Sequence, residues 1–311
     1  MKVDILYLEI TNQCNFMCKH CQNNSSYNSN CIIEFQEINN IVLYMIKHGL
    51  KTINITGGEP TIHPDFAKIL ISLVQYDIKI NVLTNGYFID RYIEIIKKYK
   101  QKIFVQVSLD GYDRDSFYKI RNNYKFNSII DNIIFLKKNG IDVHIKSTLD
   151  KDNIAEFKKY VALSQKLKCK IRFNYLNPVG RGKKIKDVCL DYQDIIEFDK
   201  SIKDPNERRM IQTINNFFPN KCSVINYKDQ IKVVKITSEG EIFPCIGFRD
   251  KKFSLGNYKK DGLLNMFENM EVLRKSIIDM IKNENCENCR CSEFCKKNCI
   301  LVCEYMMEVK A

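Results

Sequence analysis

The 311-residue chain lacks two features that would direct it out of the cytoplasm. No run of apolar residues approaches the roughly 20 that a membrane-spanning helix needs. The first apolar stretch contains Asp4 and Glu9, which a secretory signal peptide would not carry in its apolar region. We therefore expect a cytoplasmic protein with no membrane partner.

Histidine, glycine and proline are also few. The 12 glycines and 6 prolines, beside 45% hydrophobic and 28% charged residues, are ordinary for a soluble protein. We expect structural or solvent-facing roles for the four histidines, which are His20, His48, His63 and His144.

The chain has no concentrated basic tract, although its formal net charge is +12. Its lysines are spread along helical segments such as "RYIEIIKKYK" and "NIIFLKKNG", which is typical of solvated helix faces. We therefore do not predict a nucleic-acid partner. A basic surface suits an acidic electron-donor protein of the flavodoxin or ferredoxin type, or an acidic peptide.

Cysteine, by contrast, is abundant, with 14 residues. Because no secretory signal precedes them, metal binding or catalysis explains these cysteines better than disulfides do. Cys14, Cys18 and Cys21 form one group near the start of the chain. A second group lies near its end and consists of Cys286, Cys289, Cys291, Cys295, Cys299 and Cys303, with Cys222 and Cys245 upstream.

The first part of the chain alternates short β-branched runs with longer helical patterns, which predicts an α/β fold with a parallel sheet. Strands are expected at residues 4–11, 51–56, 79–86, 102–111, 141–149 and 170–178. Helices are expected at residues 34–49, 63–76, 88–99, 126–140 and 153–167. Unusual residues follow each strand, as when parallel strands deliver their loops to one active face. The segment "KDPNERR" is typical of a linker and predicts two domains, 1–200 and 201–311.

The stretch "CNFMCKHC" places Cys14, Cys18 and Cys21 at C-x3-C-x2-C spacing. Soft thiolates at this spacing select zinc or an iron–sulfur cluster. A structural zinc site normally closes with four protein ligands, and His20 could supply the fourth. A [4Fe–4S] cluster on three thiolates would instead leave one iron open to another ligand. Spacing alone leaves both interpretations open.

This motif resembles that of the radical S-adenosylmethionine (radical SAM) enzymes, in which it follows the first strand of a partial barrel. The resemblance implies a partial (β/α)6 TIM-type barrel, with a [4Fe–4S] cluster on Cys14, Cys18 and Cys21. In that family the amino and carboxylate groups of S-adenosylmethionine (SAM) chelate the fourth iron. One electron from the reduced cluster cleaves SAM to methionine and a 5′-deoxyadenosyl radical, which abstracts hydrogen from the substrate.

Two later segments extend the resemblance. "ITGGEPTIHPDF" resembles the family's glycine-rich loop, in which Gly57 and Gly58 would let the backbone approach a ligand and Glu59 would pair with the ammonium group of SAM. An ordinary strand-to-helix turn is the alternative. "QVSLDG" resembles the fourth-strand signature, which would bring Ser108 and Asp110 near the ribose or carboxylate of SAM.

Arg121 is a candidate partner for that carboxylate through a bidentate fork, and a surface arginine at a helix end is its alternative. Further candidates near the fifth and sixth strands are Ser147, Thr148, Asn153, Gly180, Arg181 and Gly182.

The C-terminal cysteines resemble the SPASM domain, which binds auxiliary [4Fe–4S] clusters in many radical SAM enzymes. The chain departs from that pattern in its longer gap after Cys222, its extra Cys291 and its closely following Cys303. A structural zinc ribbon is the alternative. The resemblance implies one cluster on Cys222, Cys245 and Cys299, and a second on Cys286, Cys289, Cys295 and Cys303.

With three cysteines, the first auxiliary cluster would have an open iron, which we hypothesise binds a substrate thiolate or the substrate backbone. The remaining thiols are expected to be buried. One of them could instead donate a hydrogen atom, as an epimerase requires, and the candidates are Cys31, Cys169, Cys189 and Cys291.

SPASM-type radical SAM enzymes act mainly on peptides and proteins, so the leading hypothesis is a peptide maturase. It would form a thioether or carbon–carbon crosslink, or epimerise a residue, in a ribosomally made peptide. Sulfatase-maturing relatives have an aspartate base at the position that Ile246 occupies here, which disfavours that reaction. Since Cys14 lies near the start of the sequence, we expect any leader to be recognised by a separate protein or by the catalytic domain.

Two alternatives come from other classes of function. One is a radical SAM enzyme of cofactor or small-molecule biosynthesis that uses the auxiliary clusters for electron transfer. The other is a zinc-containing RNA-binding protein, which colourless, zinc-loaded protein with salt-sensitive RNA affinity would reveal.

Overall fold

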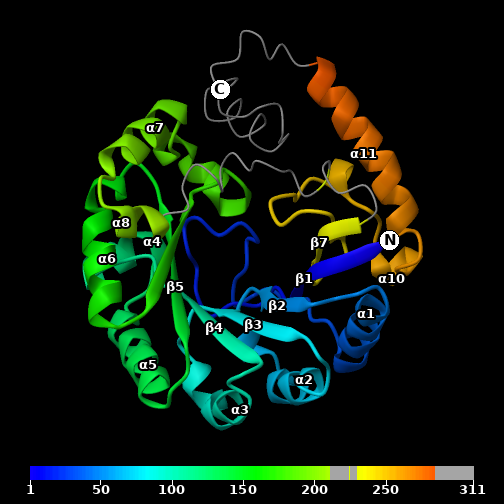
Figure 1. Cartoon of the computed structure of the whole chain (residues 1–311), viewed down its shortest axis with the longest axis horizontal. Helices are drawn as coiled ribbons and strands as arrows, with labels where there is room; N and C mark the ends of the chain where they lie inside the picture. The colour runs from blue at the N-terminus through cyan, green and yellow to red at the C-terminus, as the bar shows by residue number, and fades with distance from the viewer. Residues whose placement is uncertain (211–223, 225–229, 284–311) are drawn as a thin grey trace.

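In the computed structural model, residues 1–210, 224 and 230–283 are described, and the structural statements below concern these residues. One sheet has the strand order β6-β5-β4-β3-β2-β1-β7-β8 (Figure 1). Its strands are β1 (Lys2–Thr11), β2 (Thr52–Gly57), β3 (Lys79–Thr84), β4 (Ile103–Ser108), β5 (Val143–Leu149), β6 (Lys170–Tyr175), β7 (Gln230–Ile236) and β8 (Ile242–Phe243).

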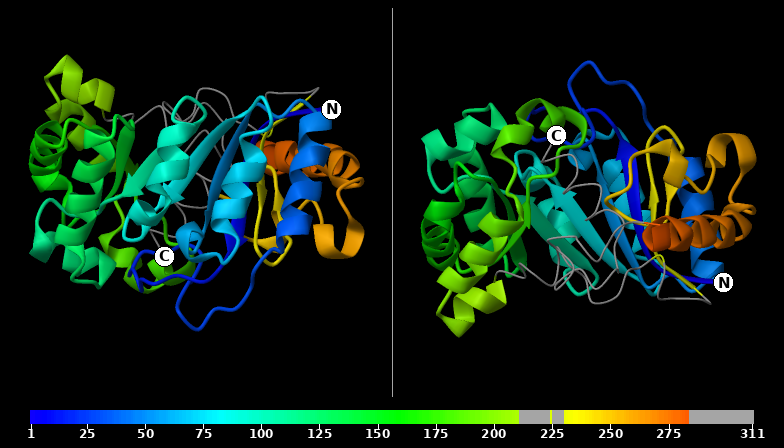
Figure 2. Two further views of the ribbon diagram at one scale, coloured as in Figure 1. Left: turned by 90° about the horizontal axis from the view of Figure 1, so that it is seen from below. Right: turned by 90° about the horizontal axis from the view of Figure 1, so that it is seen from above.

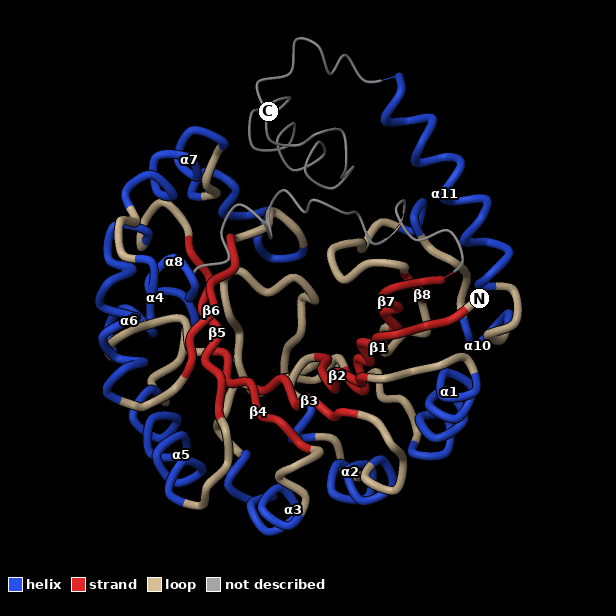
Figure 3. The backbone as a smooth tube through the Cα atoms, viewed as in Figure 1, coloured by secondary structure: helices blue, strands red, loops and turns tan. Residues whose placement is uncertain are grey.

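Helices lie along the outer side of the curved sheet (Figure 3). The α-helices are α1 (Phe35–Lys47), α2 (Phe66–Leu73), α3 (Ile93–Lys98), α4 (Arg114–Arg121), α5 (Phe126–Lys138), α6 (Phe157–Lys166), α7 (Tyr192–Ser201), α8 (Pro205–Met210), α10 (Tyr258–Asp261) and α11 (Met266–Asn283). The 3-10 helices are η1 (Pro60–Ile62), η2 (Ile89–Tyr92), η3 (Ile154–Glu156), η4 (Gly180–Val188), which is kinked at Ile185, and η5 (Lys251–Phe253). Within the described residues, no helix is long and apolar enough to cross a membrane.

The six strands and five helices expected from the sequence are confirmed, and β1 to β6 pair in parallel in sequence order. Helix α4 was not expected, because its sequence "RDSFYKIR" has little apolar periodicity. Its ends explain it: Asp113 Oδ1 accepts a 2.8 Å hydrogen bond from Ser116 N, and Asn122 ends the helix with a left-handed φ of 51°.

The strands alternate between an outward apolar face and an inward face, since successive side chains point to opposite sides of a sheet. On β1, Leu6, Leu8 and Ile10 are fully buried on the outward face, where helices such as α1 cover the sheet. The inward face carries polar residues instead, such as Lys146 on β5 and Asn174 on β6. The sequence therefore builds an apolar shell around a polar interior.

The sheet continues beyond the predicted first domain. Strand β7 pairs in parallel with β1, with Leu6 opposite Val234, and β8 pairs antiparallel with β7. The domain limits of 1–200 and 201–311 stay a prediction. Figure 2 shows that the segment joining β1 to α1 projects past the ends of the strands, which is where the cysteine motif lies.

Candidate active site

A cavity of about 330 Å³ opens at the carboxyl ends of the parallel strands; we call it the cysteine cavity. It brings together residues that are far apart in the sequence. All nine predicted cluster-loop and SAM-site residues line it, namely Cys14, Cys18, Cys21, Gly57, Gly58, Glu59, Ser108, Asp110 and Arg121.

The segment after β1 that carries Cys14, Cys18 and Cys21 is called the cysteine loop. Hydrogen bonds to neighbouring elements hold it in place. The loop after β6 contributes two, because Arg181 Nε donates to Cys18 O at 2.8 Å and Arg181 N donates to Cys21 O at 3.0 Å. Helix α4 contributes another, from Lys19 N to Ile120 O at 2.9 Å. The three thiols are therefore positioned by the barrel before any ligand binds.

Gly57 and Gly58 allow the second strand to lie directly against the cysteine loop. A Cβ atom on Gly58 would lie 1.9 Å from Gln13 O, and one on Gly57 would lie 2.1 Å from Thr11 O. The main chains meet here through hydrogen bonds from Gly58 N to Thr11 O at 2.7 Å and from Glu59 N to Gln13 O at 2.8 Å. The two glycines thus allow the two backbones to contact each other. That they also let the backbone approach a ligand stays a prediction.

Glu59 is almost completely buried, with 1% of its surface exposed. Its carboxylate accepts hydrogen bonds from Thr61 Oγ1 at 2.5 Å, Thr84 Oγ1 at 2.6 Å and Asn85 N at 2.6 Å. Burial raises its pKa, and these hydrogen bonds oppose that rise. Glu59 therefore links β2 to β3, and its predicted pairing with the SAM ammonium group stays a prediction.

Asp110 and Arg121 form a buried ion pair beside the cysteine loop. Arg121 Nη2 lies 2.5 Å from Asp110 Oδ2, and Arg121 Nη1 donates to Cys18 Sγ at 3.5 Å. Asp110 also lies 3.2 Å from His20 Nε2 and accepts from Thr148 N at 2.6 Å. The Arg121 guanidinium is thus directed at Asp110 and Cys18, and its predicted pairing with the carboxylate of SAM stays a prediction.

These contacts shift the pKa values of the groups involved. Arg121 and His20 hold the pKa of Asp110 well below its usual range, against the opposing effect of burial. Burial raises the pKa of Cys14, and the nearby Glu59 raises it further. Burial also raises the pKa of Cys18, while Arg121 opposes that rise. The raised pKa values favour the protonated thiols of Cys14 and Cys18, and binding of a metal centre would release these protons.

The residues of the cysteine cavity fit a [4Fe–4S] cluster with SAM. Three buried polar atoms around the loop have no hydrogen-bond partner among the described residues: His20 Nδ1, Arg121 Nε and Arg181 Nη2. Such atoms are costly unless a group completes their hydrogen bonds. Sulfide, thiolate and the carboxylate of SAM all accept hydrogen bonds from guanidinium groups such as those of Arg121 and Arg181.

A single zinc ion fits the cysteine motif less well. His20 is directed at Asp110, and among the described side chains no three His, Cys, Asp or Glu residues are arranged to hold one metal ion. A four-iron cluster does not need such convergence, because each thiolate binds a different iron.

The wall opposite the cysteine loop comes from β7 and the segment after β8. Lys235 Nζ donates to Ile246 O at 3.3 Å, and its side chain is 2% exposed. Burial and the nearby Arg249 lower the pKa of Lys235 to about 7. Ile246 also lines the cavity.

Sequence reasoning missed several lining residues, among them Tyr7, Glu9, Lys146, Lys235 and Arg249. The available signal was a polar or charged residue at an inward position of a strand, as in "VHIKSTL" and "QIKVVKI". Alternation along a strand that closes a barrel directs such residues into its interior.

The weaker candidates divide between the cavity and its supports. Thr148 and Arg181 line the cavity. Ser147 Oγ donates to Leu109 O at 2.5 Å, and Asn153 Nδ2 donates to Thr148 O at 3.0 Å. Gly180 and Gly182 pack against backbone, since added Cβ atoms would lie 2.4 Å from Gln22 O and 2.4 Å from Asn177 O respectively.

The proposed hydrogen donors Cys31, Cys169 and Cys189 do not line the cysteine cavity. Cys31 Sγ donates to Ser238 O at 3.5 Å, and Cys169 Sγ donates to Leu167 O at 3.4 Å. Cys245 is half-buried within the described part of the chain. The other candidates of the C-terminal part lie outside the described residues: Cys222, Cys286, Cys289, Cys291, Cys295, Cys299 and Cys303.

Two protein-family models match the chain. Residues 8–163 match the radical SAM superfamily, and residues 230–292 match SPASM, an iron–sulfur cluster-binding domain. The chain is 28% identical to AlbA, the antilisterial bacteriocin subtilosin biosynthesis protein of Bacillus subtilis, over 83% of this chain and 58% of AlbA. It is also 28% identical to a GTP 3′,8-cyclase of Clostridium acetobutylicum, over 78% of this chain and 81% of the cyclase.

Solved structures share the fold. Streptococcus suis SuiB bound to S-adenosylmethionine superposes with a TM-score of 0.76 at 19% identity, covering 96% of this chain and 73% of SuiB. The anSMEcpe structure with AdoMet and the Cp18Cys peptide superposes with a TM-score of 0.73 at 18% identity, covering 99% of this chain and 96% of anSMEcpe. The chain belongs to the radical SAM superfamily and carries a SPASM domain in its C-terminal part.

Proposed function

We propose that this radical SAM enzyme modifies a ribosomally made peptide by forming a thioether or carbon–carbon crosslink or by epimerising a residue. The observation that carries the proposal is the cysteine cavity, in which barrel residues meet Lys235, Ile246 and Arg249 from the region that matches SPASM. Supporting it, AlbA is named for bacteriocin biosynthesis, and a mycofactocin maturase of Mycolicibacterium smegmatis is 24% identical over 94% of this chain.

The membership in this superfamily implies a [4Fe–4S] cluster with SAM, which together supply one-electron chemistry that abstracts hydrogen from carbon. Cys14, Cys18 and Cys21 would hold the cluster. Arg121 holds positive charge beside Cys18, and Asp110 fixes its guanidinium.

The SPASM domain implies auxiliary iron–sulfur clusters. We assign Cys222, Cys245 and Cys299 to one, with an open iron for a substrate thiolate or backbone, and Cys286, Cys289, Cys295 and Cys303 to the other. A flavodoxin- or ferredoxin-type protein of the cytoplasm would supply electrons, and a separate protein could present the peptide's leader.

A cyclase-like reaction on a nucleotide is the second candidate, because GTP 3′,8-cyclases are as identical to this chain as AlbA is. The experiment that separates them uses reconstituted protein with reductant and SAM under anaerobic conditions. One reaction receives peptides encoded beside the gene, and a parallel reaction receives GTP. The proposal expects a mass change or an epimerised residue in a peptide, and conversion of GTP alone would overturn it.

A further inference from the structure

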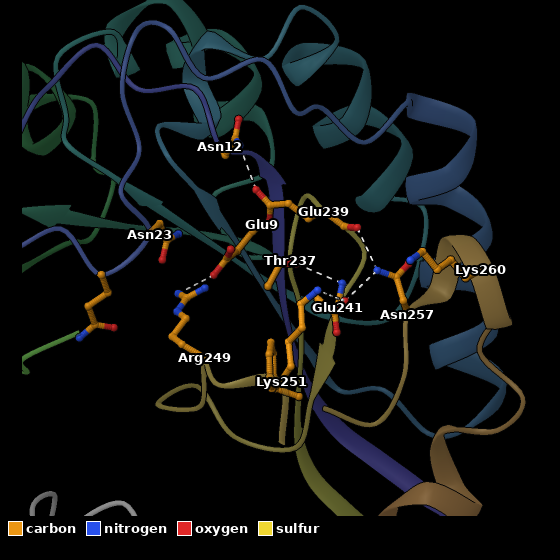
Figure 4. Close-up of a pocket in the computed structure, with 12 residues that line it drawn as sticks. Glu9, Asn12, Asn23, Thr237, Glu239, Glu241, Arg249, Lys251, Asn257 and Lys260 are labelled. Atoms are coloured by element: carbon orange, nitrogen blue, oxygen red, sulfur yellow. Dashed lines mark hydrogen bonds and ion pairs between the residues drawn. The ribbon is translucent and has the colours of Figure 1, made fainter. Parts of the chain in front are cut away.

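A second hollow of about 440 Å³ adjoins the cysteine cavity; we call it the hairpin cleft (Figure 4). One side is formed by the end of β1 and the cysteine loop. The other is formed by the β7–β8 hairpin, the segment after it and the start of α10. Its lining consists of Glu9, Asn12, Gln22, Asn23, Thr237, Glu239, Glu241, Phe243, Arg249, Lys251, Asn257 and Lys260.

The cleft is adjacent to the cysteine cavity. Glu9, Gln22, Asn23 and Arg249 line both hollows. Arg249 Nη2 lies 2.7 Å from Glu9 Oε1, and Glu9 is 4% exposed, so this ion pair marks the boundary between them. A molecule long enough to fill both would pass along the Glu9–Arg249 pair.

The cleft is built before a ligand arrives. Asn257, 9% exposed, donates through Nδ2 to Glu239 O at 3.1 Å and to Glu241 Oε1 at 3.1 Å. Asn12 Nδ2 crosses the cleft to Glu239 Oε1 at 2.9 Å (Figure 4). Gly240, with φ of 98°, makes the turn, and an added Cβ would lie 2.5 Å from Asn257 Oδ1. This fixed framework lowers the entropic cost of binding.

The chemistry of the lining selects the class of ligand. The lining carries carboxylates and cations in equal number, so neither a polyanion nor a polycation gains a net attraction; they are Glu9, Glu239, Glu241, Arg249, Lys251 and Lys260. Phe243 is the one aromatic side chain of the lining, so an apolar ligand would find little to contact. A polypeptide backbone instead needs both donors and acceptors, which the ammonium groups and the carboxylates of the lining provide together.

We propose that the hairpin cleft binds an extended peptide segment of the substrate, adjacent to the residue that enters the cysteine cavity past Glu9 and Arg249. This inference rests on the proposed function and adds the site at which the flanking residues are held. The cleft volume is within the range of ordinary ligand sites.

The test uses peptides selected from a random phage-displayed library on the reconstituted protein with SAM. The dissociation constant of a fluorescein-labelled selected peptide is then measured for wild type, Glu239→Lys and Glu239→Trp. Glu239 is exposed, so neither change disturbs the core. The lysine reverses the charge at this position, and the tryptophan fills space in the cleft. Glu268→Lys is the matched control, because Glu268 is an exposed residue of α11 that lines neither the hairpin cleft nor the cysteine cavity.

We expect both Glu239 variants to bind at least about tenfold more weakly, because a selected peptide complements the wild-type cleft. The control should bind as wild type does. Peptides that bind all four proteins equally would overturn the inference while leaving the proposed function standing. If no peptide can be selected and GTP binds equally to all four proteins, the inference and the proposed function are both overturned.

Discussion

Arg121 Nη2 lies 2.5 Å from Asp110 Oδ2 inside the barrel, while Nη1 of the same guanidinium donates to Cys18 Sγ at 3.5 Å. One arginine therefore joins the fourth strand's signature to the cysteine loop. Its positive charge lies beside a thiolate that would hold one iron of the cluster. A hydrogen bond to a cluster sulfur is one of the means by which a protein sets a reduction potential.

Replacing Arg121 by glutamine should make the midpoint potential of the [4Fe–4S] cluster more negative, because the reduced cluster carries the extra negative charge that Arg121 stabilises. An anaerobic redox titration followed by electron paramagnetic resonance measures this. Arg114→Gln, at the exposed start of the same helix, is the control and should leave the potential unchanged. An unchanged potential in Arg121→Gln would show that its bond to Cys18 has no electronic role.

Replacing Gly58 by alanine should destabilise the fold by about 3 kcal/mol or more, because the added Cβ would meet Gln13 O at 1.9 Å and backbone would have to move. Gly262→Ala is the comparison: nothing lies within 4 Å of its added Cβ, so only backbone strain of about 2 kcal/mol from its φ of 69° and ψ of −165° is expected. Urea denaturation followed by circular dichroism measures both. Equal stability of the two variants would refute the contact argument.

Asp150 should make stability depend on pH. Burial and the neighbouring Asp152 raise the pKa of Asp150 to about 6 from its ordinary value of 3.8. The folded state thus holds this proton more tightly than the unfolded chain. Stability from this group is therefore greatest below about pH 4 and is lost as the pH rises to about 6, by up to about 3 kcal/mol.

Asp150→Asn removes this titration while keeping an oxygen for Asp152 N and Asn153 N, each 3.1 Å away. The variant should be more stable than wild type at pH 7, and the difference should shrink at pH 4. Urea midpoints at the two pH values measure it, with Asp77→Asn at an exposed site as control. A difference that does not change with pH would contradict the expected titration.

Arg181→Ala should weaken retention of the cluster, because it removes the 2.8 Å bond from Nε to Cys18 O and leaves the cysteine loop less constrained. The rate of iron release to an anaerobic chelator, followed by absorbance, should rise. Lys183→Ala, two residues on and exposed, should behave as wild type. Equal rates in all three proteins would mean that the loop does not depend on Arg181.

The sequence predicted the barrel strands and the cysteine cavity because both depend on local patterns. Alternating strand and helix signals fix a parallel order, and the carboxyl ends of parallel strands necessarily share one face. This is why Cys14, Gly58 and Asp110 could be expected together.

What the sequence did not reveal depends on contacts over long separations. The Arg121–Cys18 bond spans 103 positions, and no spacing rule reports it. Strand β7 and its Lys235 were missed, because a single charged residue inside an apolar run does not tell which face it occupies until the neighbouring strand is known. Helix α4 was missed because its caps, rather than its apolar periodicity, define it.

The most direct test of the central claim is release of 5′-deoxyadenosine from SAM by anaerobically reconstituted, dithionite-reduced protein, measured by chromatography with mass spectrometry. Wild type is compared with a variant in which Cys14, Cys18 and Cys21 are all alanine. We predict release by wild type, none by the variant, and the loss of about four irons per chain. Equal release by the two proteins, or none by iron-loaded wild type, would contradict the assignment of the cysteine cavity as the site of radical chemistry.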